Sequence, residues 1–125
     1  MFQYLSENHE ELVAIKTSGK INKSDLDTLL PYIENTIKQF GKINFLWVMD
    51  SFEGWEPLSF VRDQVFDIKH AADFRRIAMV GDKKWEDRMA QAMRPFTKAQ
   101  LKYYDMGNRQ QALEWVQQES QQPSV

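Results

Sequence analysis

The first residues carry apolar side chains in short runs rather than at helical spacing. Runs at Phe2–Ser6 and Leu12–Thr17 flank a polar turn at residues 7–10, which predicts an antiparallel hairpin. The stretch Ser18–Gly19–Lys20 is predicted to end the second strand, because glycine weakens a strand and often marks its interruption.

From residue 24 the spacing changes to one apolar residue every three or four positions, which is typical of an amphipathic helix. Ser24, with Asp27 three residues later, predicts the helix start, and Gly41 predicts its end. Pro31 falls inside this helix and is expected to distort it by removing one hydrogen bond.

Ile43–Met49 is apolar at all but one position, and a second strand is predicted at Phe74–Val80, which ends in the uninterrupted apolar run Ile77–Val80. Such strands are covered on both sides, which indicates interior strands of a parallel sheet. Residues 50–57 are predicted to form a loop, and residues 58–72 to form a helix with one apolar stripe.

The same alternation continues towards the C-terminus. Residues 83–96 are predicted to form a helix with Asp82 as its N-cap, and Leu101–Asp105 a strand. Asn108 with Gln111 resembles the capping box of a last helix.

The resulting order is ββαβαβαβα. It predicts a single α/β domain with a five-stranded mixed sheet, an N-terminal antiparallel hairpin and four helices. The domain is predicted to cover residues 1–119, followed by a frayed polar tail at residues 120–125.

Composition narrows the classes of function. The chain has 125 residues, which fits one domain, and no cysteine, which excludes disulfides, thiol nucleophiles and thiolate metal sites. A net charge of −2, with basic and acidic residues interspersed, disfavours a nucleic-acid partner. No apolar run approaches the ~20 residues that span a bilayer. We therefore expect a cytoplasmic protein without a metal, a cofactor or a membrane span.

The candidate site lies after the two interior strands, because α/β proteins bind ligands at the carboxyl ends of parallel strands. Aromatic and methionine side chains follow both strands and could line a crevice for an apolar molecule. The candidate ligand-binding residues are Asp50, Ser51, Phe52, Trp55, Gly81, Asp82, Trp85, Met89 and Met93. An alternative interpretation assigns the same residues to helix capping, a tight turn and core packing.

Phe60 and Phe66 lie roughly 110–130° away from the centre of the apolar stripe of the helix predicted at residues 58–72. They are either covered by another element or form a docking surface for a protein partner or a second copy of the chain. His9 and His70 lack metal-ligand spacing, and no carboxylates stand out as an acid–base pair, so no catalytic residue is assigned.

Several short motifs accompany this order of elements. They are Gly19–Lys20 before a helix, Leu46–Asp50 followed by Gly54–Trp55, Ile77–Asp82 with Trp85, and Ala112 with Trp115. Together they resemble the SpoIIAA-like family of bacterial proteins, whose fold is similar to that of STAS domains. The resemblance covers nearly the whole chain.

The resemblance implies a small cytoplasmic domain that is not a known enzyme. STAS relatives dock onto protein partners, and in anti-sigma-factor antagonists a phosphorylated serine follows an Asp–Ser pair. Here Asp50–Ser51 is followed by Phe52, so the phosphoserine switch is expected to be missing. The fold is also similar to that of lipid-carrying CRAL-TRIO domains, which allows an apolar small ligand by analogy.

Two functional hypotheses follow. The first is a non-catalytic binding module of the SpoIIAA-like type that holds an apolar or lipid-like molecule in the crevice. The alternative is a protein-docking or regulatory module that uses Phe60, Phe66 and residues 50–55. The proposed crevice requires that Ile43–Met49 and Ile77–Val80 run side by side in the same direction.

Overall fold

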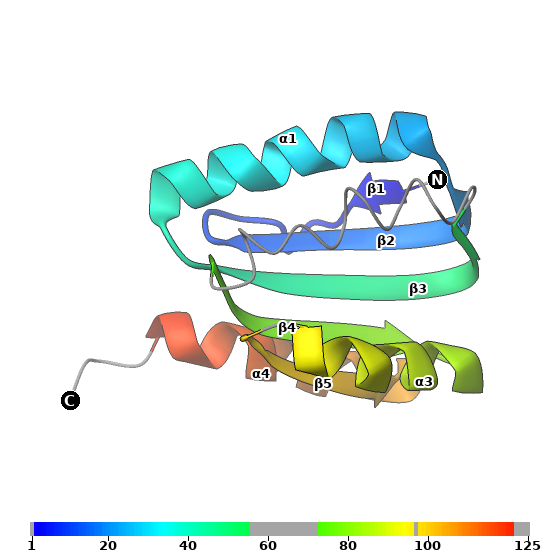
Figure 1. Cartoon of the computed structure of the whole chain (residues 1–125). Helices are drawn as coiled ribbons and strands as arrows, with labels where there is room; N and C mark the ends of the chain where they lie inside the picture. Colours follow the sequence, from blue (N-terminus) through cyan, green and yellow to red (C-terminus); the bar gives the residue numbers. More distant parts are fainter. Residues whose placement is uncertain (1, 56–72, 97, 122–125) are drawn as a thin grey trace.

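In the computed structural model, residues 2–55, 73–96 and 98–121 are described, and they form a five-stranded sheet with helices on both faces (Figure 1). The strands are β1 (Phe2–Tyr4), β2 (Leu12–Ile21), β3 (Ile43–Trp55), β4 (Phe74–Gly81) and β5 (Gln100–Asp105). The α-helices are α1 (Lys23–Phe40), α3 (Lys84–Met93) and α4 (Arg109–Gln121), with short 3₁₀ helices η2 (Arg94–Phe96) and η3 (Met106–Asn108).

The described part of the chain thus contains three α-helices rather than the four predicted. The remaining predicted helix, at residues 58–72 with Phe60 and Phe66, lies outside the described residues. None of the helices within the described ranges is both long and apolar enough to cross a bilayer.

The sheet follows the chain in the order β1-β2-β3-β4-β5. β1 pairs with β2 antiparallel, which confirms the predicted hairpin, and the other neighbours pair in parallel. Phe45 of β3 pairs with Ile77 of β4, and Trp47 with Met79, so the predicted side-by-side arrangement of the two interior strands is confirmed.

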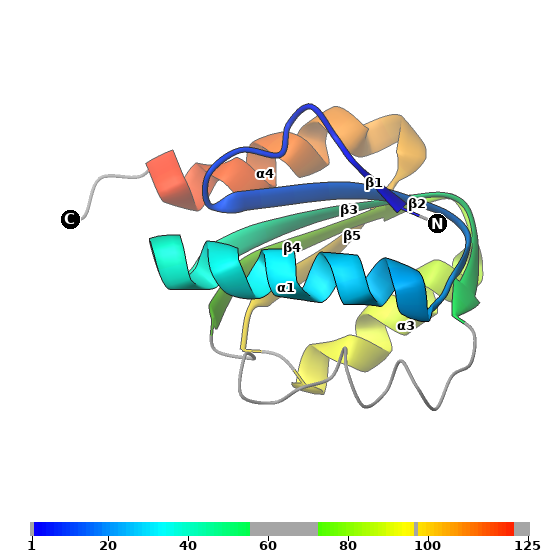
Figure 2. The same ribbon diagram turned by 90° about the horizontal axis from the view of Figure 1, so that it is seen from above.

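The helices form two layers around the sheet. α1 and α3 cover one face and α4 covers the other (Figure 2). When parallel strands are added one after another in the same direction, right-handed connections place all their helices on one face of the sheet. The opposite face is then left for α4, which follows the last strand. The buried core beneath α1 and α3 includes Val13, Ile15, Leu26, Trp47, Phe52 and Met79. The core beneath α4 includes Ala14, Leu46, Val48, Val80, Ala112 and Val116.

Two strands are longer than predicted. β2 continues through Gly19 to Ile21, and β3 continues to Trp55, so the predicted strand break and the predicted loop at residues 50–55 are both wrong. The reason is mutual pairing, because Gly19 pairs with Phe52 and Ile21 with Trp55. Register shifts near Gly19 absorb the irregular backbone as a bulge without ending the ladder.

The start of α1 also differs from the prediction. Its N-cap is Asn22 rather than Ser24. The Asp25 backbone N–H donates to Asn22 Oδ1 at 2.9 Å, and the Asn22 N–H donates to Asp25 Oδ2 at 3.1 Å, which is a capping box two residues upstream. The predicted end is confirmed, since Gly41 adopts φ +83° and closes the helix.

A partly buried ion pair joins the hairpin turn to the start of α4. Arg109 Nη1 lies 2.9 Å from Glu7 Oε2, and the hydrogen bond from Arg109 lowers the pKa of the Glu7 carboxyl. Arg109→Gln is expected to lower the free energy of unfolding by about 1 kcal/mol at pH 7, measured by urea denaturation. Lys23→Gln, which removes an exposed pair with Asp27, is the control and should change little.

The same ion pair should depend on acidity. The pKa of Glu7 is lower in the folded protein than its ordinary value of 4.5, so the ionised carboxyl stabilises the fold at pH values above 4.5. This contribution is lost as the pH falls through the folded-state pKa. The difference between the wild type and Arg109→Gln should therefore shrink in acid. An unchanged difference between pH 7 and pH 3 would contradict the role given to Glu7.

Candidate functional site

β3 and β4 end at the same edge of the sheet, together with β5. We call this edge the carboxyl edge. The paired register of β3 and β4 runs to Val48 and Val80, and Gly81 then pairs with Asp105 of β5. The loops and strand extensions after these positions are therefore held close together at the carboxyl ends of the strands. The order of the described strands does not reverse between β3 and β4, so this edge has no switch-point crevice of the doubly wound type.

The predicted polar residues of the carboxyl edge are exposed. Asp50 and Ser51 lie on the bulged extension of β3, and Asp82 follows β4. Ser51 adopts φ +58°, a left-handed conformation that is uncommon for a residue other than glycine. Within residues 2–55, 73–96 and 98–121, Ser51 makes no hydrogen bond to a histidine or a carboxylate that could act as a general base.

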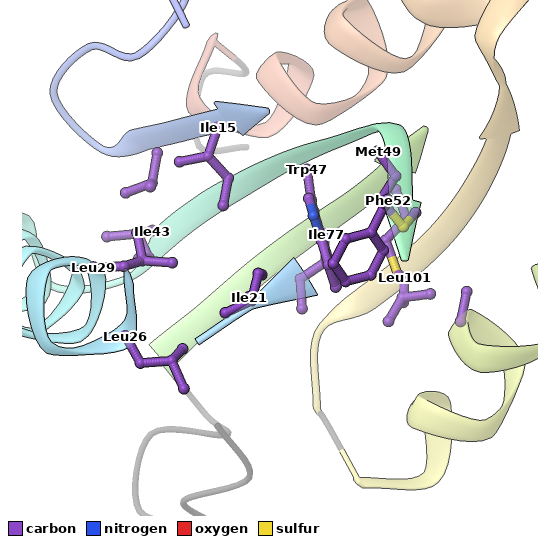
Figure 3. Close-up of a cluster of buried hydrophobic side chains, with 13 residues drawn as sticks. Ile15, Ile21, Leu26, Leu29, Ile43, Trp47, Met49, Phe52, Ile77 and Leu101 are labelled. Atoms are coloured by element: carbon purple, nitrogen blue, oxygen red, sulfur yellow. The ribbon is translucent and has the colours of Figure 1, made fainter. Parts of the chain in front are cut away.

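Phe52 lies beneath this edge rather than on its surface. Its side chain is 0% exposed and packs against Trp47, with ring centroids 5.5 Å apart (Figure 3). The centroid of the Trp85 ring lies 5.6 Å from that of Phe52, and the two rings are tilted by 31°. Trp85 itself remains 38% exposed. Trp47 and Phe52 therefore form a buried aromatic base, and Trp85 adds one exposed indole to it. Trp55 is the last residue of β3.

An apolar stripe continues from Trp85 along α3. Met89 and Met93 follow at intervals of four residues, are half-buried, and pack against the core beneath α1 and α3. The predicted residues Trp85, Met89 and Met93 thus share one side of α3, and we call them the α3 stripe.

Glu86 is the residue that the sequence analysis missed. Its side chain is 0% exposed, although glutamate is rarely buried. Glu86 Oε1 accepts hydrogen bonds from the backbone N–H groups of Asp82 and Lys83, both at 3.1 Å. The predicted N-cap at Asp82 is wrong, because the cap position is Lys83 and the Glu86 carboxyl at the third helical position satisfies these N–H groups.

Three elements meet around the Glu86 carboxyl. A Cβ atom added to Gly81 would overlap Glu86 Oε1 and would lie 2.9 Å from the Tyr103 hydroxyl, so both side chains use the space that glycine leaves. The Tyr103 hydroxyl donates to the Lys83 carbonyl at 3.4 Å, and Lys83 Nζ donates to the Phe52 carbonyl at 3.1 Å. The start of α3 is therefore tied to both β5 and β3.

Burial shifts the pKa of both ionisable side chains here upwards. Burial raises the pKa of Glu86, against the opposing effect of the N–H groups of Lys83 and Asp82. Burial, followed by the charge of Glu86, raises the pKa of Tyr103 to about 12. Glu86 Oε2 is buried and has no hydrogen-bond partner among the described residues. A neutral Glu86 carries a proton that this oxygen can donate.

Metal ligation finds no support in the described ranges. No group of three or more histidine, cysteine or acidic side chains is placed there to hold an ion. His9 lies on the surface, 2.7 Å from Glu10, and His70 lies outside the described residues.

Comparison with known proteins places the chain in a family. The family model described as SpoIIAA-like matches residues 12–117. The chain belongs to the SpoIIAA-like family. This SpoIIAA-like domain is similar in structure to an uncharacterised protein of Shewanella loihica with a SpoIIAA-like fold, with a TM-score of 0.71 and 21% sequence identity over 84% of this chain and 83% of that chain. A likeness at this identity shows the fold alone. No curated protein matches the sequence.

The resemblance identified from the sequence motifs is thereby confirmed at the level of the family and of a STAS-like module. The matched residues include the carboxyl edge, the α3 stripe and Glu86.

Proposed function

We propose that this SpoIIAA-like domain is a non-catalytic binding module that holds an apolar or lipid-like small molecule at the carboxyl edge. The observation that supports it most directly is Trp85, which leaves 38% of its surface exposed while its ring packs against the buried Phe52 ring. Covering that exposed indole with an apolar ligand would be favourable, and a fully packed aromatic base beneath it keeps the surface fixed.

The rest of the α3 stripe suits the same role. Met89 and Met93 are half-buried and follow Trp85 along one side of the helix. Methionine has three rotatable side-chain bonds and a polarisable sulfur, so it adapts to irregular apolar shapes. A ligand that rests on Trp85 could extend along this side of α3.

A binding role also fits the polar residues of the edge. Ser51 has no base beside it among the described residues, and Asp50 and Asp82 are exposed, where carboxylates are well solvated. These positions are suited to contacting the polar end of a ligand. They do not form the nucleophile-and-base arrangement that covalent catalysis requires.

The alternative of a protein-docking module stays a prediction, as does a cytoplasmic location. The residue after Asp50–Ser51 is Phe52, and its complete burial supports the expectation that the phosphoserine switch of anti-sigma-factor antagonists is missing. Phe60 and Phe66, which would carry a docking surface, lie outside the described residues.

The proposal is tested by replacing the exposed indole. Trp85→Ala is expected to weaken binding of an apolar probe, 2-nonanone, by about tenfold, because the contact with the indole is lost. Affinity is measured by NMR titration of ¹⁵N-labelled protein, which does not depend on tryptophan fluorescence. Chemical-shift changes in the wild type should centre on Trp85 and Met89.

Tyr4→Ala is the matched control for this experiment. Tyr4 is 39% exposed, about as much as Trp85, but it lies on β1 at the far edge of the sheet. Its replacement should leave the affinity unchanged. If Trp85→Ala binds the probe as well as the wild type does, or if the shifts centre on β1, the site is elsewhere.

A further inference from the structure

Two oxygen-bearing side chains converge over Gly81, next to the α3 stripe. The Glu86 carboxyl and the Tyr103 hydroxyl approach the same point from α3 and from β5, and a methyl group on Gly81 would collide with both. The packing of these two side chains therefore depends on a residue without a Cβ at this position.

The two carboxyl oxygens of Glu86 have different surroundings. Oε1 is occupied by the N–H groups of Asp82 and Lys83. Oε2 is buried and unpaired among the described residues, which is unusual for a polar atom inside a folded domain. Lys83 Nζ donates to the Phe52 carbonyl instead, so this cationic side chain does not pair with the oxygen.

Glu86 is also well placed relative to the apolar residues of the proposed site. Met89 and Met93 follow Glu86 by three and seven residues, so all three lie on neighbouring parts of the α3 surface. A molecule with its polar end at Glu86 could extend its apolar part along the two methionines. These three side chains thus offer a polar contact at one end and apolar contacts at the other, which suits an amphiphilic ligand.

We propose that Glu86, as a neutral acid, donates a hydrogen bond from Oε2 to an oxygen at the polar end of the bound molecule. The Tyr103 hydroxyl would be a second donor, turning to the ligand from the Lys83 carbonyl, which lies 3.4 Å away. This inference rests on the proposed function and adds the chemical class of the ligand, which is an amphiphile with a hydrogen-bond-accepting oxygen such as a carbonyl. Burial favours the neutral form that this donation requires.

Two probes of similar length separate the polar contact from apolar binding. 2-Nonanone carries a carbonyl acceptor, whereas 1-chlorononane carries no strong acceptor. The wild type is expected to bind the ketone about tenfold more tightly, which corresponds to one hydrogen bond made in a site shielded from water. Both affinities are measured by NMR titration of the full chain.

Variants then assign the contact to Glu86. Glu86→Leu should remove the roughly tenfold preference for the ketone over the chloroalkane, because leucine cannot donate a hydrogen bond. Glu86→Gln should retain the preference, because the amide can accept from the two backbone N–H groups with its oxygen and donate with its nitrogen. Tyr103→Phe, which removes only a hydroxyl, should weaken ketone binding severalfold and serves if Glu86→Leu fails to fold.

The outcomes are distinguishable. Equal affinities for the two probes, unchanged in Tyr103→Phe and in the Glu86 variants, would overturn this inference and leave the proposed apolar site standing. If neither probe binds the wild type, the proposed function fails, and this inference fails with it. A ketone preference that Glu86→Leu or Tyr103→Phe removes supports it.

Discussion

Gly81→Ala is expected to lower the free energy of unfolding by about 1–3 kcal/mol, because a Cβ at this position has no room. It would overlap Glu86 Oε1 and lie 2.9 Å from the Tyr103 hydroxyl. The ends of both side chains are constrained, since Glu86 is completely buried and holds two backbone N–H groups. Relief of the overlap would therefore break the hydrogen bonds that begin α3.

Urea denaturation at neutral pH measures this change, with Gly107→Ala as the control. A Cβ at Gly107 would meet no atom within 4 Å, and Gly107 does not adopt a left-handed φ, so its replacement should stay within about 0.5 kcal/mol of the wild type. A double-mutant cycle of Gly81→Ala with Tyr103→Phe should recover part of the loss. Wild-type stability in Gly81→Ala would mean that the Glu86 carboxyl is not held as described.

The core of the fold was predictable from local patterns. Ile43–Met49 and Ile77–Val80 carry apolar side chains on both faces, and this property indicates interior strands, because such side chains are covered on both sides of the sheet. The short runs around residues 7–10 identified the hairpin for a similar reason. Such signals lie within a few residues of each other, so no knowledge of distant contacts is needed.

The extensions of β2 and β3 were not predictable in this way. Residues 18–20 and 50–55 contain glycine, serine and aspartate, which locally favour turns. They form strand because each segment supplies the hydrogen-bond partners of the other across more than thirty residues of sequence. The positive φ angles of Ser51 and Gly54 are accommodated within that ladder.

The candidate site was predictable in position but not in its buried chemistry. The rule for parallel strands placed Asp50, Ser51 and Asp82 at one edge, and the structure brings their strands together there. Glu86 was missed because an acidic residue in the first turn of a helix is ordinarily an exposed one. Its burial depends on Gly81 and on Tyr103 of β5, which lies seventeen residues further along the chain.

Glu86→Gln is expected to become progressively more stable than the wild type as the pH rises above about 4.5. Burial raises the pKa of Glu86 above its ordinary value of 4.5, so the folded wild type holds a proton that the unfolded chain has released. The stability contributed by the protonated carboxyl is complete at pH values below the pKa of Glu86 in the unfolded chain. It is lost as the pH rises through the pKa of Glu86 in the folded protein. Glutamine carries no such proton and suffers no such loss.

The difference in free energy of unfolding between Glu86→Gln and the wild type should change by up to about 1.4 kcal/mol per pH unit. This slope applies between the pKa of Glu86 in the unfolded chain and its pKa in the folded protein, because unfolding releases one proton there. Tyr103 does not interfere, because its pKa of about 12 keeps its hydroxyl neutral there. Urea denaturation of both proteins from pH 4 to pH 8 gives the difference directly. Glu114→Gln, at an exposed position of α4, corrects for the general effect of removing one negative charge.

The shape of the two stability curves decides the charge state of Glu86. Diverging curves mean that the folded protein resists ionising this carboxyl, which leaves Oε2 with a proton to donate at the carboxyl edge. Parallel curves across the range would mean that Glu86 ionises as easily in the folded protein as in the unfolded chain. The buried oxygen would then be an acceptor, and a ligand that offers only a carbonyl oxygen could not pair with it.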